Sequence, residues 1–204
     1  NIKSAGKKKN RAPAVEPGTY PARLVGVLDL GLQPQRPYKG KEKPPAHMLN
    51  LTYELLDEFL PGEDGEEDES KPRWVSEDLP FYGLDVDKAY SMDPEEELEG
   101  DWEQLVGRPL MVTVVNNTGK DDIVYENVAG TSGMRPREAS KAPELVNKPR
   151  VFTLDDPDME VFNGLPDFLK EKIKGNLEFK GSDLEAALGG GSDDSEDEGD
   201  DDEW

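Results

Sequence analysis

Two long stretches in the N-terminal half have the pattern of β-strands. The first runs from Tyr20 to Gly31 and is rich in Val and Leu, and Gly26 within it indicates a bend or bulge. The second runs from Met48 to Leu56 with strict alternation. Its apolar face holds Leu49, Leu51, Tyr53 and Leu55, and its other face holds Met48, Asn50, Thr52 and Glu54. We expect the apolar stripe, including Tyr53, to lie in the core.

Three shorter strands are expected further along the chain. Arg73–Glu77 follows an acidic turn at 61–69 and continues irregularly through Leu79 to Tyr82. Leu110–Val115 and Ile123–Val128 are separated by a turn at 116–122, so we expect them to pair as a hairpin. Between the third and fourth strands, Asp93 and Pro94 have the pattern of a helix start.

The C-terminal third predicts irregular chain followed by short helices. Proline is frequent between Gly133 and Pro149, which we expect to run over the surface. Helices are predicted over 157–163, after the cap Asp156, and over 166–174, ended by Gly175. Ser182 and Glu185 form a capping box that opens a last turn to residue 188.

This order of elements predicts a mainly β protein with a few short helices. Five strands with a helix between the third and fourth is the order of an OB-like Greek-key barrel, although other small barrels and a β-sandwich share it. The chain then divides into a basic flexible arm at 1–17, an OB-like domain with a helical extension at 18–188, and an acidic tail at 189–204.

Charge restricts the kind of ligand that this body can bind. The 204 residues carry 46 acids and 24 bases, a net charge of −22, and nine of the acids lie between Asp193 and Glu203. The body is therefore acidic as well, and a polyanion can bind only at a local basic strip. Two such strips exist, the arm from Lys3 to Arg11 and the loop from Arg36 to Lys43.

Several functional classes are disfavoured by composition. With no cysteine and only His47, the chain lacks the residues for disulfides, thiolate zinc sites or multi-histidine metal sites. We expect no catalytic residue, no metal and no cofactor. No stretch is apolar enough to span a membrane, and the first residues lack a signal-peptide pattern, so we expect a cytoplasmic protein, in the host cytoplasm if the chain is viral.

The basic loop and nearby aromatic residues have the chemistry of a single-strand nucleic-acid site. Such sites combine positive charge along a backbone track with flat side chains on which bases stack, and OB-folds bind on the strand 2–3 face and on the loops joining strands 1–2 and 4–5. The candidate bases are Arg23, Arg36, Lys39, Lys41, Lys43, Arg73 and Arg108. The candidate aromatics are Tyr38, Trp74 and Tyr82, although Trp74 also fits a core position.

The tail is the second candidate interaction site. It has a glycine hinge at 189–191, and its last five residues are Asp200, Asp201, Asp202, Glu203 and Trp204. A run of like charges cannot fold alone, so we expect Trp204 to insert into a pocket on a partner.

This tail, together with the strand order, resembles the single-stranded DNA-binding proteins of bacteriophages, the T7-type among them, although those end in Phe rather than Trp. The resemblance implies a barrel that binds unpaired DNA with little sequence preference. It also implies a tail that recruits replication or recombination proteins and can lie over the DNA groove of its own barrel. A homodimer is compatible with it.

Two other functions remain open from the sequence. An acidic DNA mimic or interaction protein would also carry a large negative charge, but its carboxylates should cover a folded face rather than gather in a tail and a turn. A magnesium-dependent nuclease would need clustered carboxylates, for which Glu178 and Lys180 with Asp155, Asp156 or Asp167 are the candidates.

Overall fold

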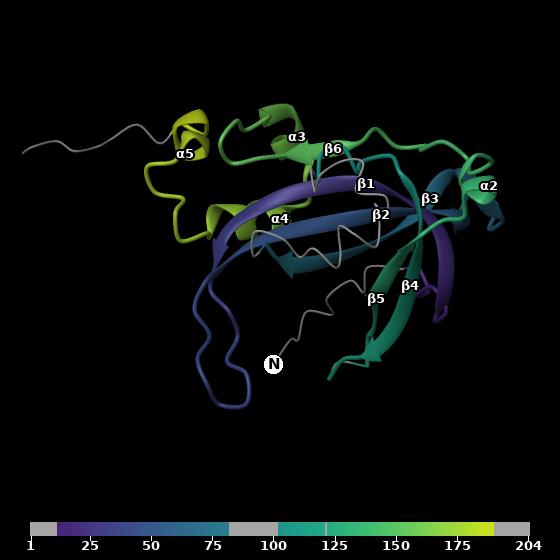
Figure 1. Cartoon of the computed structure of the whole chain (residues 1–204), viewed down its shortest axis with the longest axis horizontal. Coiled ribbons are helices and arrows are strands. Elements are labelled where there is room, and N and C mark those ends of the chain that lie inside the picture. The colour runs from purple at the N-terminus through teal and green to yellow at the C-terminus, as the bar shows by residue number, and fades with distance from the viewer. Residues whose placement is uncertain (1–11, 82–101, 121, 190–204) are drawn as a thin grey trace, which may run out of the picture.

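A computed structural model describes residues 12–81, 102–120 and 122–189 of the chain. Its centre is a sheet with the strand order β3-β2-β1-β4-β5, in which neighbouring strands are antiparallel, and a short β6 pairs parallel to β1 (Figure 1). The strands are β1 (Gly18–Gln33), β2 (Ala46–Pro61), β3 (Glu67–Pro80), β4 (Pro109–Thr118), β5 (Val124–Gly133) and β6 (Arg150–Phe152). The mainly β class is therefore confirmed, and all five predicted strands are present.

The apolar stripe of β2 lies in the main core, as the alternation predicted. Leu51, Tyr53 and Leu55 are fully buried and pack with residues of β1, β3 and β4. The phenol of Tyr53 donates a 2.8 Å hydrogen bond to Glu77. Burial and this carboxylate partner raise the pKa of Tyr53 far above its ordinary value.

Strand β1 is bent by two bulges. The pairing of β1 with β2 shifts register between Leu24 and Gly26 and again between Asp29 and Gly31. The predicted irregularity at Gly26 is therefore confirmed. The second bulge places Gly31 at a φ of +71°, where the amide donates to the carboxylate of Asp29.

Replacing Gly31 with alanine is expected to lower the free energy of unfolding by about 2–3 kcal/mol, because two costs add. The positive φ disfavours a side chain, and an added Cβ would lie 2.7 Å from Cγ of Asn176 and 2.8 Å from Cδ1 of Leu154. Urea denaturation measures the change. Gly65→Ala is the control, since Gly65 shares the positive φ but has open space around it; equal losses in both variants would rule out the packing cost.

The barrel that the strand order predicts is not closed in the described residues. In the described part of the chain, β3 and β5 are the two ends of the sheet order and share no hydrogen-bonded ladder. Side chains bridge them instead: Arg73 on β3 pairs with Glu126 on β5 at 3.0 Å. The buried Val15 sits at this seam, where its amide donates to Glu126 and its carbonyl accepts from Asn116. The folded part of the chain therefore begins before Gly18.

The second face of β2, which carries its polar residues, is also covered. Asn50, Thr52 and Glu54 are all buried. The proline-rich segment at 133–149 has no buried residue, as expected of a segment that runs over the surface, and it leads back to the sheet at β6. We call residues 134–149 the return segment. Beyond it, a second core joins Leu28 and Leu30 of β1 to the helical extension.

The extension contains the three short helices that the sequence predicts, with small changes at their ends, and a further short helix at 136–139 was not predicted. The described helices are α2 (Pro136–Ala139), α3 (Met159–Gly164), α4 (Asp167–Lys174) and α5 (Asp183–Ala187). Asp158, not Asp156, caps α3, and Ser182 caps α5 by accepting from the amide of Glu185. The helix start expected at Asp93 lies outside the described residues. None of the described helices has the length and apolar character needed to cross a membrane.

Candidate nucleic-acid interface

The loop between β1 and β2 is a small ordered hairpin. Tyr38 and Lys41 exchange two backbone hydrogen bonds of 2.9 and 3.0 Å. Between them, Lys39 and Gly40 both have positive φ, at 52° and 74°, which is the geometry of a type I′ turn. Figure 1 shows this loop extending away from the sheet at the end where β1 finishes. We call residues 34–45 the basic hairpin.

The basic hairpin brings together the candidates that the sequence placed in this loop. Tyr38 is 58% exposed, and the ammonium groups of Lys39 and Lys43 lie 5.2 and 5.1 Å from the centre of its ring. Arg36 and Lys41 are exposed on the same hairpin. An aromatic ring and four bases thus share one projecting element, with Glu42 as the only acid between residues 34 and 45.

A hollow of about 510 Å³ lies at the base of the basic hairpin, and we call it the hairpin groove. Arg36, Tyr38 and Lys43 line one side of it, and Asp78 of β3 and Lys172 of α4 line the other. Lys172 forms an ion pair with one oxygen of Asp78, and Asn50 donates a 2.8 Å hydrogen bond to the other oxygen. Asp78, the one carboxylate among the described residues that line this groove, is therefore paired.

A second hollow of about 400 Å³ opens along the seam between β3 and β5, and we call it the seam groove. Its walls are Asn50 on β2, Ser76, Glu77 and Asp78 on β3, Asn127 and Val128 on β5, and Phe168 on α4. Glu77 accepts the hydrogen bond of Tyr53. Asp78 lines both hollows. The two grooves are therefore neighbours on one surface.

Arg23 and Arg108 do not belong to this surface. The guanidinium of the buried Arg23 donates to the carbonyl oxygens of Gly107, Ala142 and Pro143 at 2.5, 3.0 and 2.6 Å. Ten residues of extended strand separate Arg23 from the start of the basic hairpin, or roughly 30 Å. Arg108 is partly buried next to Gly107. Arg23 therefore holds the return segment in place, and its position is unsuited to a phosphate contact.

Arg73 and Trp74 are also engaged within the protein. Arg73 pairs with Glu126 across the seam and donates to the carbonyl of Pro13. Trp74 is 37% exposed, its indole donates to Glu54 at 3.1 Å, and the guanidinium of Arg150 lies 4.5 Å from its ring centre. Trp74 is thus neither a core residue nor an open stacking surface. The remaining candidates, Tyr82 and residues 200–204, lie outside the described residues.

Glu54 is a structurally important residue that the sequence did not reveal. Its side chain accepts hydrogen bonds from the amide of Val146 at 2.7 Å and from the side chain of Asn147 at 2.7 Å, in addition to Trp74. These bonds fasten the return segment over the outer face of β2. In the sequence Glu54 occupies a polar position of an alternating strand, which normally indicates exposure to solvent.

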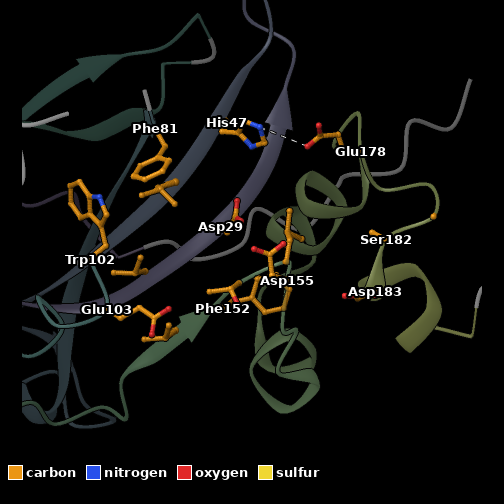
Figure 2. A pocket seen from close by; sticks show the side chains of 16 residues that line it. Asp29, His47, Phe81, Trp102, Glu103, Phe152, Asp155, Glu178, Ser182 and Asp183 are labelled. Atoms are coloured by element: carbon orange, nitrogen blue, oxygen red, sulfur yellow. Dashed lines mark ion pairs between the residues drawn. The ribbon is translucent and has the colours of Figure 1, made fainter. Parts of the chain in front are cut away.

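A third hollow, of about 760 Å³, has the wrong charge for a polyanion. Figure 2 shows His47 facing Glu178, which lies 3.8 Å away, with Asp29, Asp155 and Asp183 nearby. No lysine or arginine is among its described lining residues. Within the described ranges no three histidine or carboxylate side chains converge to hold a metal ion, so the nuclease candidates do not form a metal site there.

Comparisons with known proteins give no further guidance. No family model, no curated protein and no solved structure matches this chain, so a function has to be inferred from its own residues.

Proposed function

We propose that this protein binds single-stranded DNA without sequence preference through the basic hairpin and the hairpin groove. The observation that carries the proposal is the basic hairpin itself. It concentrates four bases around a tyrosine that is 58% exposed, in a chain whose net charge is −22. Apart from the basic arm at residues 3–11, the rest of such an acidic chain would repel an anionic polymer, so this local concentration of charge favours binding at the hairpin.

The chemistry of the hairpin matches the two components of single-strand recognition. The phenol ring of Tyr38 gives a base a flat surface on which to stack, and stacking tolerates every base. Lys39 and Lys43 beside the ring, and Arg36 in the groove, are placed to contact the phosphates that flank a stacked base. The type I′ turn holds these groups in position before binding, which lowers the entropy cost of association.

The proposal includes an OB-type barrel that is open at the seam between β3 and β5. An OB-fold is a five-stranded, partly open barrel whose loop between strands 1 and 2 contributes to the ligand site, and the basic hairpin occupies that loop. The outer face of β2 is covered by the return segment and is excluded as a binding face. The DNA path is therefore assigned to the hairpin end of the barrel.

We also propose that the acidic tail recruits replication or recombination proteins. Nine carboxylates within residues 193–203 suit a basic surface on a partner, and Trp204 adds an apolar contact that electrostatic attraction alone would not need. A pull-down of replication and recombination proteins by the full chain and by a chain lacking residues 193–204 tests this assignment.

Tyr38→Ala is expected to weaken binding of a fluorescent dT oligonucleotide of about 12 nucleotides by on the order of tenfold, since one stacked base contributes about 1–3 kcal/mol. Because the ring is exposed, the melting temperature should not change. Fluorescence anisotropy titrations measure affinity, and Tyr38→Phe, which keeps the flat ring, should bind within about twofold of the unmodified protein.

The same titration tests the proposed function as a whole. Affinity of the unmodified protein should fall steeply between about 50 and 200 mM salt, because phosphate contacts release counterions. No change in anisotropy at either salt concentration would disprove binding of single-stranded DNA. Binding with an unchanged affinity in Tyr38→Ala would place the strand elsewhere on the protein.

A further inference from the structure

We propose that helix α4 forms the second half of the DNA path, with Phe168 as a stacking surface and Lys172 as a phosphate contact. This inference rests on the proposed function and extends the interface from the basic hairpin into the seam groove. It assigns a ligand-binding role to the helical extension, whose helix α4 carries Lys170, Lys172 and Lys174.

The geometry of α4 separates an anchoring side from a free side. Leu169 and Ile173 are buried in the second core and fix the helix on the sheet. Phe168 and Lys172 are also four residues apart, so they lie on one side of the helix with Cβ atoms about 5–6 Å from each other. Fixing the helix through Leu169 and Ile173 therefore fixes the direction in which Phe168 and Lys172 point.

Phe168 has no packing role that would explain a phenylalanine. Its side chain is 66% exposed, the highest value among the large hydrophobic residues that the structure describes. It lines the seam groove together with Asn127 and Val128 of β5 and the carboxylates Glu77 and Asp78 of β3. A flat ring at the edge of a polar groove is a stacking surface for a base.

Lys172 connects this ring to the basic hairpin. Lys172 lines the hairpin groove together with Arg36, Tyr38 and Lys43, while Phe168 lines the seam groove. Asp78 borders both, so a strand stacked on Tyr38 continues past Lys172 to Phe168 over contiguous surface. The positive charge of Lys172 and the hairpin would attract either a nucleic acid or an acidic peptide. The rings of Tyr38 and Phe168 favour the nucleic acid, because its bases can stack on them.

The carboxylate of Asp78, which pairs with Lys172, competes with a phosphate for that lysine. A phosphate has to share Lys172 with the carboxylate, and Asn50 keeps one hydrogen bond to Asp78 when it does. In an Asp78→Asn background the competing charge is absent. Replacing Lys172 with alanine in that background therefore removes the phosphate contact without leaving an unpaired carboxylate behind.

The ring is tested with four variants and the 12-nucleotide dT oligonucleotide. Phe168→Ala and Phe168→Leu should bind on the order of tenfold more weakly, because leucine keeps apolar area but has no flat face, whereas Phe168→Tyr should bind within about twofold of the unmodified protein. Leu177→Ala is the control, since Leu177 is 56% exposed on the same extension and lines neither groove. The melting temperature should be equal in all four.

The lysine is tested by the salt dependence of binding. Asp78→Asn/Lys172→Ala should show a slope of log affinity against log salt that is smaller by about 0.7 than the slope of Asp78→Asn. Lys174→Ala in the same background is the matched control, since Lys174 is exposed on the same helix but lines neither groove.

The outcomes separate this inference from the proposed function. If the unmodified protein binds and Tyr38→Ala weakens binding, but Phe168→Ala and the lysine variant behave as their controls, the strand does not follow α4 and the inference is wrong while the proposed function stands. If Phe168→Leu binds as well as Phe168→Tyr, the side chain contributes apolar area only and the stacking role is wrong. Absence of binding by the unmodified protein overturns both.

Discussion

Replacing Arg36, Lys39, Lys41 and Lys43 together with alanine is expected to weaken single-stranded DNA binding several hundredfold at about 0.1 M salt. The slope of log affinity against log salt contains about 0.7 for each phosphate contact with a single strand, so losing four contacts should lower it by about 3. That change in slope gives the several hundredfold loss of affinity at about 0.1 M salt. All four side chains are exposed on the basic hairpin, so the melting temperature should be nearly unchanged.

A charge-matched control is available on the same chain. Lys141, Lys148, Lys174 and Lys180 are also exposed, and none of them lines the hairpin or seam groove. Their combined replacement with alanine changes the net charge by the same amount as the hairpin variant. Anisotropy titrations at several salt concentrations should therefore show a large loss in the first variant and a small one in the second. Equal losses would mean that binding responds to overall charge and that the hairpin is not the site.

Replacing Glu54 with alanine is expected to lower the free energy of unfolding by about 3–5 kcal/mol. The carboxylate is 1% exposed and accepts from the amide of Val146, the side chain of Asn147 and the indole of Trp74. Each buried donor left without an acceptor costs about 1–3 kcal/mol, and solvent entering the site recovers part of the total. The return segment would lose its main attachment to β2.

Urea denaturation measures this loss, and two variants sharpen it. Glu54→Gln keeps one carbonyl acceptor and should lose less than Glu54→Ala. Glu144 lies on the same return segment but its side chain is 91% exposed beside Arg23, so Glu144→Ala should change stability by less than about 1 kcal/mol. A Glu54→Ala protein as stable as Glu144→Ala would show that the return segment is held by its apolar contacts alone.

The strands and the basic character of the β1–β2 loop are predictable because their signals are local. The alternation in β2 places Tyr53 in the core, and the sequence between Arg36 and Lys43 carries its own charge and turn residues. The capping box at Ser182 is equally local. Such features depend on residues within one or two turns of chain, so no knowledge of the tertiary structure is needed.

The residues that the sequence misassigns are those whose partners are distant in the chain. Arg23 has the charge of a phosphate contact, but its acceptors at Ala142 and Pro143 are about 120 residues away. Glu54 has the pattern of an exposed residue, but the return segment covers it. Strand β6 has only three residues, directly after the proline-rich stretch, which are too few for a periodic signal.

Phe168 illustrates the same limit in the candidate site. A phenylalanine in a short helix normally indicates a buried face, and only the packing of Leu169 and Ile173 shows that Phe168 is on the exposed side. Its relation to the basic hairpin depends on how α4 docks near Asp78. That docking combines β3, α4 and the β1–β2 loop, and no local sequence pattern contains it.

The central claim is that a DNA strand runs from the basic hairpin along α4, and photo-crosslinking tests it most directly. The full chain is irradiated with a thymine-containing oligonucleotide, and the crosslinked peptides are identified by mass spectrometry. We predict crosslinks in two peptides, one containing Tyr38 and one containing Phe168, with both lost when unlabelled single-stranded DNA competes. Crosslinks confined to peptides outside residues 34–45 and 166–174, or no crosslinks under conditions where DNA is bound, would contradict it.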